Sequence, residues 1–132
     1  MIKNGNRPDL IAYRLEQAHS AINEAQVMIN NNMLSAAVNR IYYGMFYVVL
    51  ALALKYGFET SKHSQLIGWF NKNFIKEGKI DSRYGKILKA AFDFRQKADY
   101  ATFTDFSKEE VVDMHNNMNY FIEEINAYIL KD

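Results

Sequence analysis

The amino-acid sequence predicts an all-α fold, an up-and-down bundle of four to five antiparallel helices. Three observations support this prediction. Apolar residues recur at steps of three and four along several segments, which is the spacing of one face of an α-helix. Short turns separate these segments, and short turns favour helices that fold back on one another. One segment, from Ile41 to Leu54, is almost entirely apolar, so other helices must cover it on every side.

The first helix is expected from about Pro8 to Asn30. Proline suits the first turn of a helix, where its missing N–H would have had no partner. The apolar stripe of this helix consists of Ile11, Leu15, Ala18, Ile22, Ala25 and Ile29. Three asparagines at 30–32 then interrupt the helix. The second helix is therefore expected to run antiparallel to the first.

The second helix is expected from about Met33 to Tyr56, and Gly57 is a usual residue for closing a helix. Its apolar run from Ile41 to Leu54 is shorter than the roughly 20 residues that a bilayer requires. We therefore interpret the segment as the buried core helix of the bundle.

One stripe of this core helix carries the polar groups Arg40, Tyr43 and Tyr47. Two interpretations are open. The arginine can extend to the rim while the phenols bond to backbone groups. Alternatively, these side chains form one wall of a binding site.

A third helix is expected from about Lys62 to Lys76. Lys62 and His63 lie in its first turn, where free N–H groups and the helix dipole favour an anion. Positive side chains do not stabilise a helix at that end, which favours a binding role. The alternative for His63 is a core position, because it lies on the apolar stripe of the helix.

The fourth helix is expected from Ser82 or Arg83 to about Tyr100, and Arg95 falls inside its apolar stripe. A charge at such a position is unfavourable unless it is paired or faces a solvated cleft. Asp99, one turn further along, is the expected partner.

The last helix is expected to run to about Lys131. The sequence from Ser107 to Glu110 has the form of a capping box, in which the first and fourth residues satisfy each other's backbone N–H groups.

Length and composition restrict the function. The 132 residues suit a single domain, residues 1–132, with a real hydrophobic core. The absence of cysteine excludes disulfides, zinc–cysteine sites and thiol nucleophiles. With 16 basic and 15 acidic residues, the net charge of +1 provides no global attraction to nucleic acid or to a membrane. The amino terminus lacks the apolar core of a signal peptide, so we expect a cytoplasmic protein that does not bind membranes.

Several kinds of site are not expected. The three histidines are far apart and do not have metal-ligand spacing, and the glycines do not form a phosphate-binding loop. We expect neither a metal nor a cofactor. What remains is a set of cations and phenols, with one carboxylate, that suits a phosphate-bearing ligand. This set consists of Arg40, Tyr43, Lys62, His63, Arg95, Lys97, Asp99 and Tyr100.

Three short segments resemble the HEPN family, the helical domains named for higher eukaryotes and prokaryotes nucleotide-binding. They are Ala36–Tyr47, Lys62–Ser64 and Arg95–Tyr100, and their order and spacing match stand-alone prokaryotic members of uncharacterised function. The resemblance implies a homodimer with a ligand cleft at or near its interface. It also implies a possible partner, a minimal nucleotidyltransferase encoded next door.

Many members of this family are metal-independent ribonucleases of toxin–antitoxin systems, in which an arginine is followed after four to six residues by a histidine. Arg95 matches the arginine, but Tyr100, Ala101 and Thr102 stand where the histidine is expected. A phenol with an ordinary pKa of about 10 is a poor general base at neutral pH. The expected enzyme activity is therefore uncertain.

Three hypotheses follow. The first is a dimer that binds a nucleotide or RNA phosphate through Arg40, Lys62 and Arg95, with other cleft residues shaping the site. Those other residues are Tyr43, His63, Asp99 and Tyr100. The second is a ribonuclease toxin that uses Arg95 with His63 or Tyr100. The third is a purely structural helical module for protein interaction, in which Asp99 neutralises Arg95 and the cleft is packed shut.

Overall fold

Five α-helices make up most of the described part of the chain. The computed structural model describes residues 6–100 and 106–131, apart from the side chain of Tyr100. The helices are α1 (Arg7–Asn30), α2 (Leu34–Lys55), α3 (His63–Phe70), α4 (Ser82–Tyr100) and α5 (Lys108–Leu130). A short π-helix, η2 (Asn71–Ile75), continues α3. The described residues contain no strand, and the predicted all-α class is confirmed.

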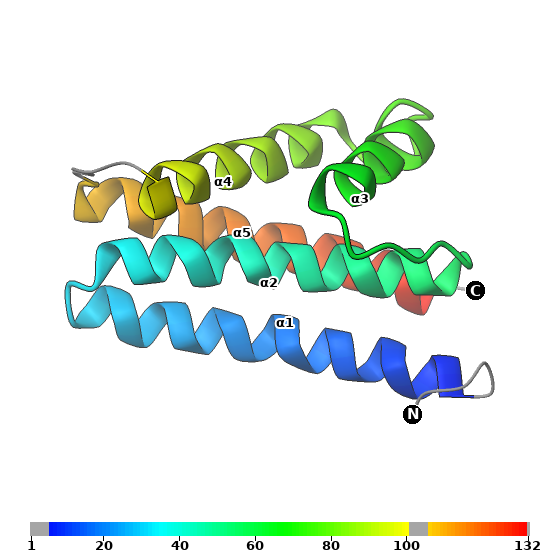
Figure 1. Ribbon diagram of the computed structural model, residues 1–132, viewed down its shortest axis with the longest axis horizontal. Coiled ribbons are helices and arrows are strands. Elements are labelled where there is room, and N and C mark those ends of the chain that lie inside the picture. The colour runs from blue at the N-terminus through cyan, green and yellow to red at the C-terminus, as the bar shows by residue number, and fades with distance from the viewer. Residues whose placement is uncertain (1–5, 101–105, 132) are drawn as a thin grey trace.

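Four long helices lie side by side and alternate in direction along the chain (Figure 1). Helices α1 and α4 run one way, and α2 and α5 run the other way. The short helix α3 crosses α2 steeply at the end of the bundle where α2 finishes. The predicted up-and-down bundle is therefore present, with α3 as a crossing element between its second and third long helices.

Helix α2 is the centre of the bundle and packs against α1, α3, α4 and α5. By length and composition it is also a candidate membrane span among the described residues, but 72% of its apolar window is buried inside the protein. At 22 residues the helix is longer than its apolar run, so length alone does not decide between the two interpretations. This degree of burial is typical of the core helix of a helical bundle.

A glycine in the middle of α2 permits close contact between three helices. A Cβ atom at Gly44 would lie 2.2 Å from Met118 Cε of α5 and 3.1 Å from Ala21 Cβ of α1. An added methyl group would displace the flexible end of Met118 and press against Ala21 Cβ. Both neighbouring helices therefore pack directly against the backbone of α2.

Local signals in the sequence mark several of the helix ends. Ser107 Oγ accepts from Glu110 N at 3.1 Å, and Glu110 Oε1 accepts from Ser107 N at 3.1 Å, which completes the predicted capping box. Gly57, after α2, has a φ of 79°, a conformation that favours glycine. Asn32, in the turn between α1 and α2, has a φ of 57°.

The third helix differs from the expected continuous α-helix. Its second half is a π-helix, in which Lys76 N donates to Asn71 O at 2.8 Å, five residues back. Phe70, just before this turn, and Phe74, within it, are both buried. Sequence periodicity does not distinguish such a turn from an α-helical one.

Candidate functional site

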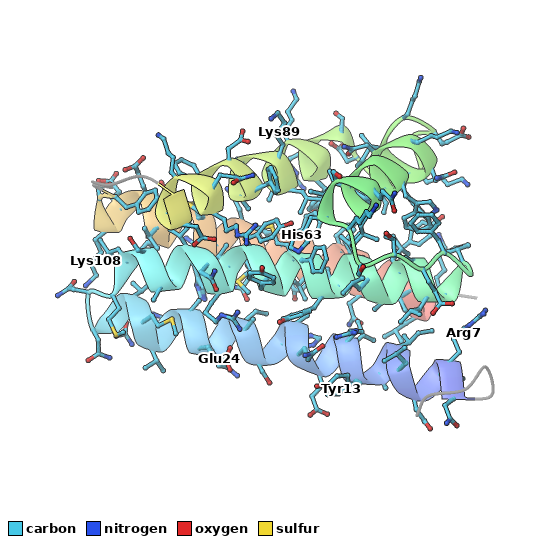
Figure 2. The ribbon with its side chains drawn as sticks, viewed as in Figure 1. Arg7, Tyr13, Glu24, His63, Lys89 and Lys108 are labelled. Carbon is cyan, nitrogen blue, oxygen red and sulfur yellow. The ribbon has the colours of Figure 1, made fainter. Side chains whose placement is uncertain are left out.

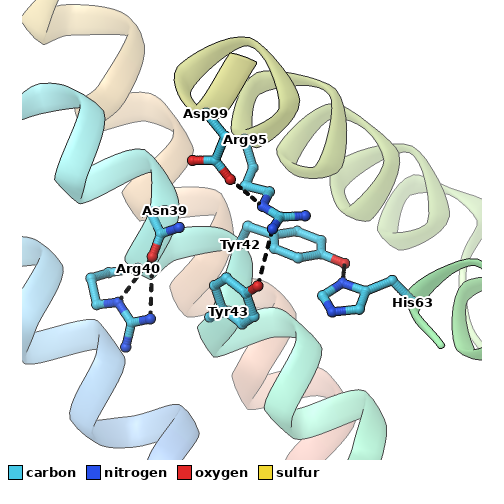
Figure 3. A network of polar contacts seen from close by, with 7 residues as sticks. All are labelled: Asn39, Arg40, Tyr42, Tyr43, His63, Arg95 and Asp99. Atoms are coloured by element: carbon cyan, nitrogen blue, oxygen red, sulfur yellow. Dashed lines mark hydrogen bonds and ion pairs between the residues drawn. The ribbon is translucent and has the colours of Figure 1, made fainter. Parts of the chain in front are cut away.

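Arg95 on α4 lies beside two tyrosines of α2 (Figure 3). Its Nη2 atom donates to the Tyr43 hydroxyl at 3.1 Å. Its Nε atom lies 2.8 Å from Asp99 Oδ2, one turn further along α4. This contact is an ion pair without hydrogen-bond geometry, since Nε is buried and makes no hydrogen bond. Asp99 is therefore the ion-pair partner of Arg95, as the sequence predicts.

His63, the first residue of α3, lies close to the same tyrosines (Figure 3). Its Nδ1 atom is 2.8 Å from the Tyr42 hydroxyl, across 21 positions of sequence. Its ring stacks on Phe46 with a centroid separation of 4.1 Å and an angle of 17° between the planes. Figure 2 places His63 between α2, α3 and α4, whereas Lys89 projects outward.

The rings of Tyr42 and Tyr43 connect the two basic groups. Arg95 Cζ lies 5.5 Å from the centre of the Tyr42 ring and 5.3 Å from the centre of the Tyr43 ring. The centre of the His63 ring lies 5.7 Å from that of each tyrosine. Contacts of a cation with an aromatic face at such distances are attractive. We call Tyr42, Tyr43, His63 and Arg95 the arginine–histidine cluster.

Burial changes the titration of two groups in the cluster. It raises the pKa of Tyr42 above its ordinary range, an effect that the positive charge of Arg95 opposes. It lowers the pKa of His63, because burial disfavours the charged imidazolium, and the nearby Arg95 charge lowers that pKa further. At neutral pH the phenol is therefore protonated and the imidazole is neutral.

Two nitrogen atoms of the cluster have no hydrogen-bonding partner among the described residues. They are Arg95 Nη1 and His63 Nε2. The Arg95 side chain as a whole is 17% exposed. The cluster thus presents a guanidinium edge and an imidazole edge, both of which suit a phosphate oxygen.

Arg40 lies on the opposite side of Tyr43, toward α1 (Figure 3). Its Cζ atom is 5.4 Å from the Tyr43 ring centre, and its Nη2 atom donates to Asn39 Oδ1 at 3.2 Å. Its Nη1 atom pairs with Glu24 Oε1 at 3.5 Å. A pocket of about 140 Å³ opens here, lined by Glu16, Gln17, Ser20, Glu24, Arg40 and Tyr47. Arg40 thus contacts the cluster through Tyr43 but is directed into an acidic pocket between α1 and α2.

The structure brings together Tyr43, His63, Arg95 and Asp99 from the residues expected at the site. Lys62 is adjacent to His63 in sequence, and it is exposed just before α3 begins. The side chain of Tyr100 and residues 101–105 lie outside the described part of the structure. The expectations that concern them stay predictions.

Sequence reasoning missed two residues that hold His63 in place. Tyr42 is completely buried, and its hydroxyl bonds to the imidazole. Phe46 provides the stacking surface. The available signal was their spacing of four in a helix, which puts both on one face of α2.

The cluster has the composition of an anion site, not a metal site. Among the residues that the structure describes, no group of three or more His, Cys, Asp or Glu side chains is arranged to hold a metal ion. The available groups are a guanidinium, an imidazole and the phenol of Tyr43, since Tyr42 is completely buried. They can bind, orient and polarise a phosphate group without a metal.

Comparisons with known proteins identify the family of this chain. The family model described as the HEPN domain matches residues 11–128. A UPF0332 protein of Thermotoga maritima is 36% identical over 91% of this chain and 91% of its own length. A protein of Methanocaldococcus jannaschii named "Putative toxin MJ0142" is 31% identical over 88% of this chain and 79% of its own length. The match covers all five helices, and the chain therefore belongs to the HEPN domain family.

Proposed function

We propose that this HEPN protein binds the phosphate groups of RNA or of a nucleotide at the arginine–histidine cluster. The observation that carries the proposal is the state of Arg95. Its guanidinium is held by Asp99 and Tyr43, yet Nη1 has no hydrogen-bonding partner among the described residues and 17% of the side chain is exposed. A guanidinium has five N–H donors, so these two contacts leave donors for a ligand.

The alternative of a purely structural interaction module expects a different state of Arg95. It requires the ion pair with Asp99 together with a cleft that is closed to solvent. The ion pair is present, but 17% of the arginine side chain and 29% of the aspartate side chain are exposed. This exposure favours the binding proposal.

The wider role that we propose is that of a toxin component in a toxin–antitoxin pair. One relative carries the word toxin in its name, and the family resemblance adds a minimal nucleotidyltransferase as the partner. We propose a homodimer that acts in the cytoplasm, where its RNA targets are found. Light scattering after size exclusion tests the dimer, since it should give twice the 15.4 kDa mass of one chain.

Thermal unfolding in the presence of a ligand panel tests the binding proposal. Mononucleotides and short single-stranded RNA should raise the melting temperature, because a ligand at 100 times its Kd stabilises the folded state by about 2.7 kcal/mol. Arg95→Ala should abolish the shift. The proposal fails if the protein responds to none of these ligands and Arg95→Ala only makes it more stable.

A second candidate function is metal-independent cleavage of RNA by Arg95 with His63. The specific observation in its favour is that His63 contacts the same two tyrosine rings as Arg95. Tyr100 remains the other candidate from the sequence. Incubation with labelled RNA in EDTA decides this point, since the candidate requires cleavage in wild type that is absent in Arg95→Ala.

A further inference from the structure

The hydrogen bond between Tyr42 and His63 is unusual because the phenol is fully buried. Tyr42 has 0% of its surface exposed. Its hydroxyl has one hydrogen-bonding partner among the described residues, His63 Nδ1 at 2.8 Å. The imidazole is only partly buried, and its Nε2 atom has no hydrogen-bonding partner among the described residues. The two partners therefore have very different access to water.

This difference determines which atom donates the hydrogen. If His63 Nδ1 carried the hydrogen and donated it, the buried O–H of Tyr42 would have no acceptor. An unsatisfied buried donor costs about 1–3 kcal/mol. If Tyr42 donates instead, Nδ1 is the acceptor and both groups are satisfied. Burial also keeps the phenol protonated, since it raises the pKa of Tyr42. A neutral His63 then carries its hydrogen on Nε2.

Packing holds the imidazole in this orientation. One face stacks on Phe46 at 4.1 Å between ring centres, and the plane of the Tyr43 ring lies at 88° to the imidazole. The charged and titratable groups that face His63 are Tyr42 and Tyr43 from α2 and Arg95 from α4. No carboxylate among the described residues pairs with the imidazole, so nothing there favours its protonated form.

We propose that Tyr42 is a positioning residue that fixes His63 as the Nε2–H tautomer, so that His63 Nε2–H and Arg95 Nη1 together donate to the oxygens of one phosphodiester. The inference rests on the proposed binding function. It goes further by assigning the second donor, its tautomer and the residue that sets it.

A chemical consequence separates binding from catalysis. A general base needs a free lone pair, and in this tautomer the lone pair lies on Nδ1, where Tyr42 occupies it. Neutral His63 therefore cannot take the proton of a 2′-hydroxyl through Nε2. As an acid it would become an imidazolate, which is inaccessible near neutral pH. His63 in this state binds phosphate and does not transfer protons.

Nitrogen NMR of the histidine side chains tests the tautomer without any ligand. Long-range proton–nitrogen spectra distinguish protonated from unprotonated ring nitrogens. Two reference tautomers are built into the chain, because backbone carbonyls only accept. His115 Nε2 lies 2.9 Å from Ile22 O and must carry the hydrogen. His19 Nδ1 lies 2.7 Å from Leu15 O, so in His19 the hydrogen is on Nδ1. Wild-type His63 should give the same pattern as His115.

Tyr42→Phe removes only the hydroxyl and should shift His63 toward a mixture of tautomers. Tyr47→Phe is the matched control, since that phenol lies on the same helix and makes no hydrogen bond with the described residues; it should leave His63 unchanged. An Nδ1–H tautomer in wild type would overturn the inference. So would a His63 spectrum that Tyr42→Phe does not alter.

Binding of a fluorescently labelled oligouridylate tests the donor role. His63→Ala should weaken binding about 5- to 10-fold, as expected for the loss of one hydrogen bond. His63→Gln places an amide N–H near the Nε2 position and should restore most of the affinity. Equal losses in the two variants would contradict the donor role. A wild type that shows the tautomer but binds no RNA would reject the proposed function and leave the tautomer assignment standing.

Discussion

Arg95 occupies a position where the helical spacing of α4 favours an apolar side chain. Its neighbours compensate for the charge through the Asp99 carboxylate, the Tyr43 hydroxyl and the Tyr42 ring. The ion pair with Asp99 spans four positions of one helix, so it was predictable from sequence. The contact with Tyr43 spans 52 positions, and only the tertiary structure reveals it.

The lowered pKa of His63 makes a prediction about stability. Burial and the Arg95 charge disfavour the imidazolium in the folded state. The unfolded chain, with an ordinary histidine pKa of about 6.5, therefore binds more protons than the folded chain as the pH falls below that value. The contribution of His63 to the free energy of unfolding should be complete above about pH 6.5 and should decrease as the pH falls below that value.

Urea unfolding of wild type and His63→Gln between pH 7.5 and pH 5 measures this effect. The wild type should lose free energy of unfolding relative to His63→Gln as the pH falls, since glutamine does not titrate. His19 and His115 are present in both proteins and cancel in the comparison. A difference that is independent of pH would mean that folding does not perturb His63.

At the scale of the elements, α2 determines both the core and the site. Its buried face meets α1 and α5 around Gly44, and its other face presents Tyr42, Tyr43 and Phe46 to α3 and α4. Any shift of α2 toward one neighbour would therefore move the rings that position Arg95 and His63.

Two glycine-to-alanine substitutions test the close packing of α2. Gly44→Ala should lower the free energy of unfolding by about 1–2 kcal/mol, because the cost of overpacking exceeds the gain in helix propensity. Gly68→Ala, in α3, has no atom within 4 Å of the new methyl group and should raise stability by up to about 1 kcal/mol. Denaturant unfolding measures both. Equal effects would mean that α1 and α5 do not pack tightly against Gly44.

The elements differ in how far the sequence predicts them. The long helices and the capping box at Ser107 are encoded in local spacing, and the structure has them where expected. The π-helix Asn71–Ile75 is not encoded in this way, because the apolar spacing in that segment also fits an α-helix. The hydrogen bond between Tyr42 and His63 is also not encoded in local spacing, since the sequence does not specify the angle at which α3 crosses α2.

At the scale of the whole molecule, the near-zero net charge gives the local cluster its importance. With a net charge of +1, the chain has no general attraction for a polyanion, so RNA binding must come from a few placed groups. The cluster lies between α2, α3 and α4, and α1 and α5 contribute none of its four side chains. Those two helices support it through the core.

The affinity for a labelled single-stranded RNA tests the central claim most directly, measured by fluorescence anisotropy for wild type, Arg95→Ala and Arg83→Ala. Arg83 is a matched control on the same helix, because its Nη2 atom also donates to a tyrosine hydroxyl, that of Tyr84, at 2.8 Å. We predict that Arg95→Ala weakens binding at least about 10-fold, the effect of losing a charged hydrogen bond, and that Arg83→Ala changes it by less than about twofold. Equal losses in the two variants, or no loss in Arg95→Ala, would contradict the account.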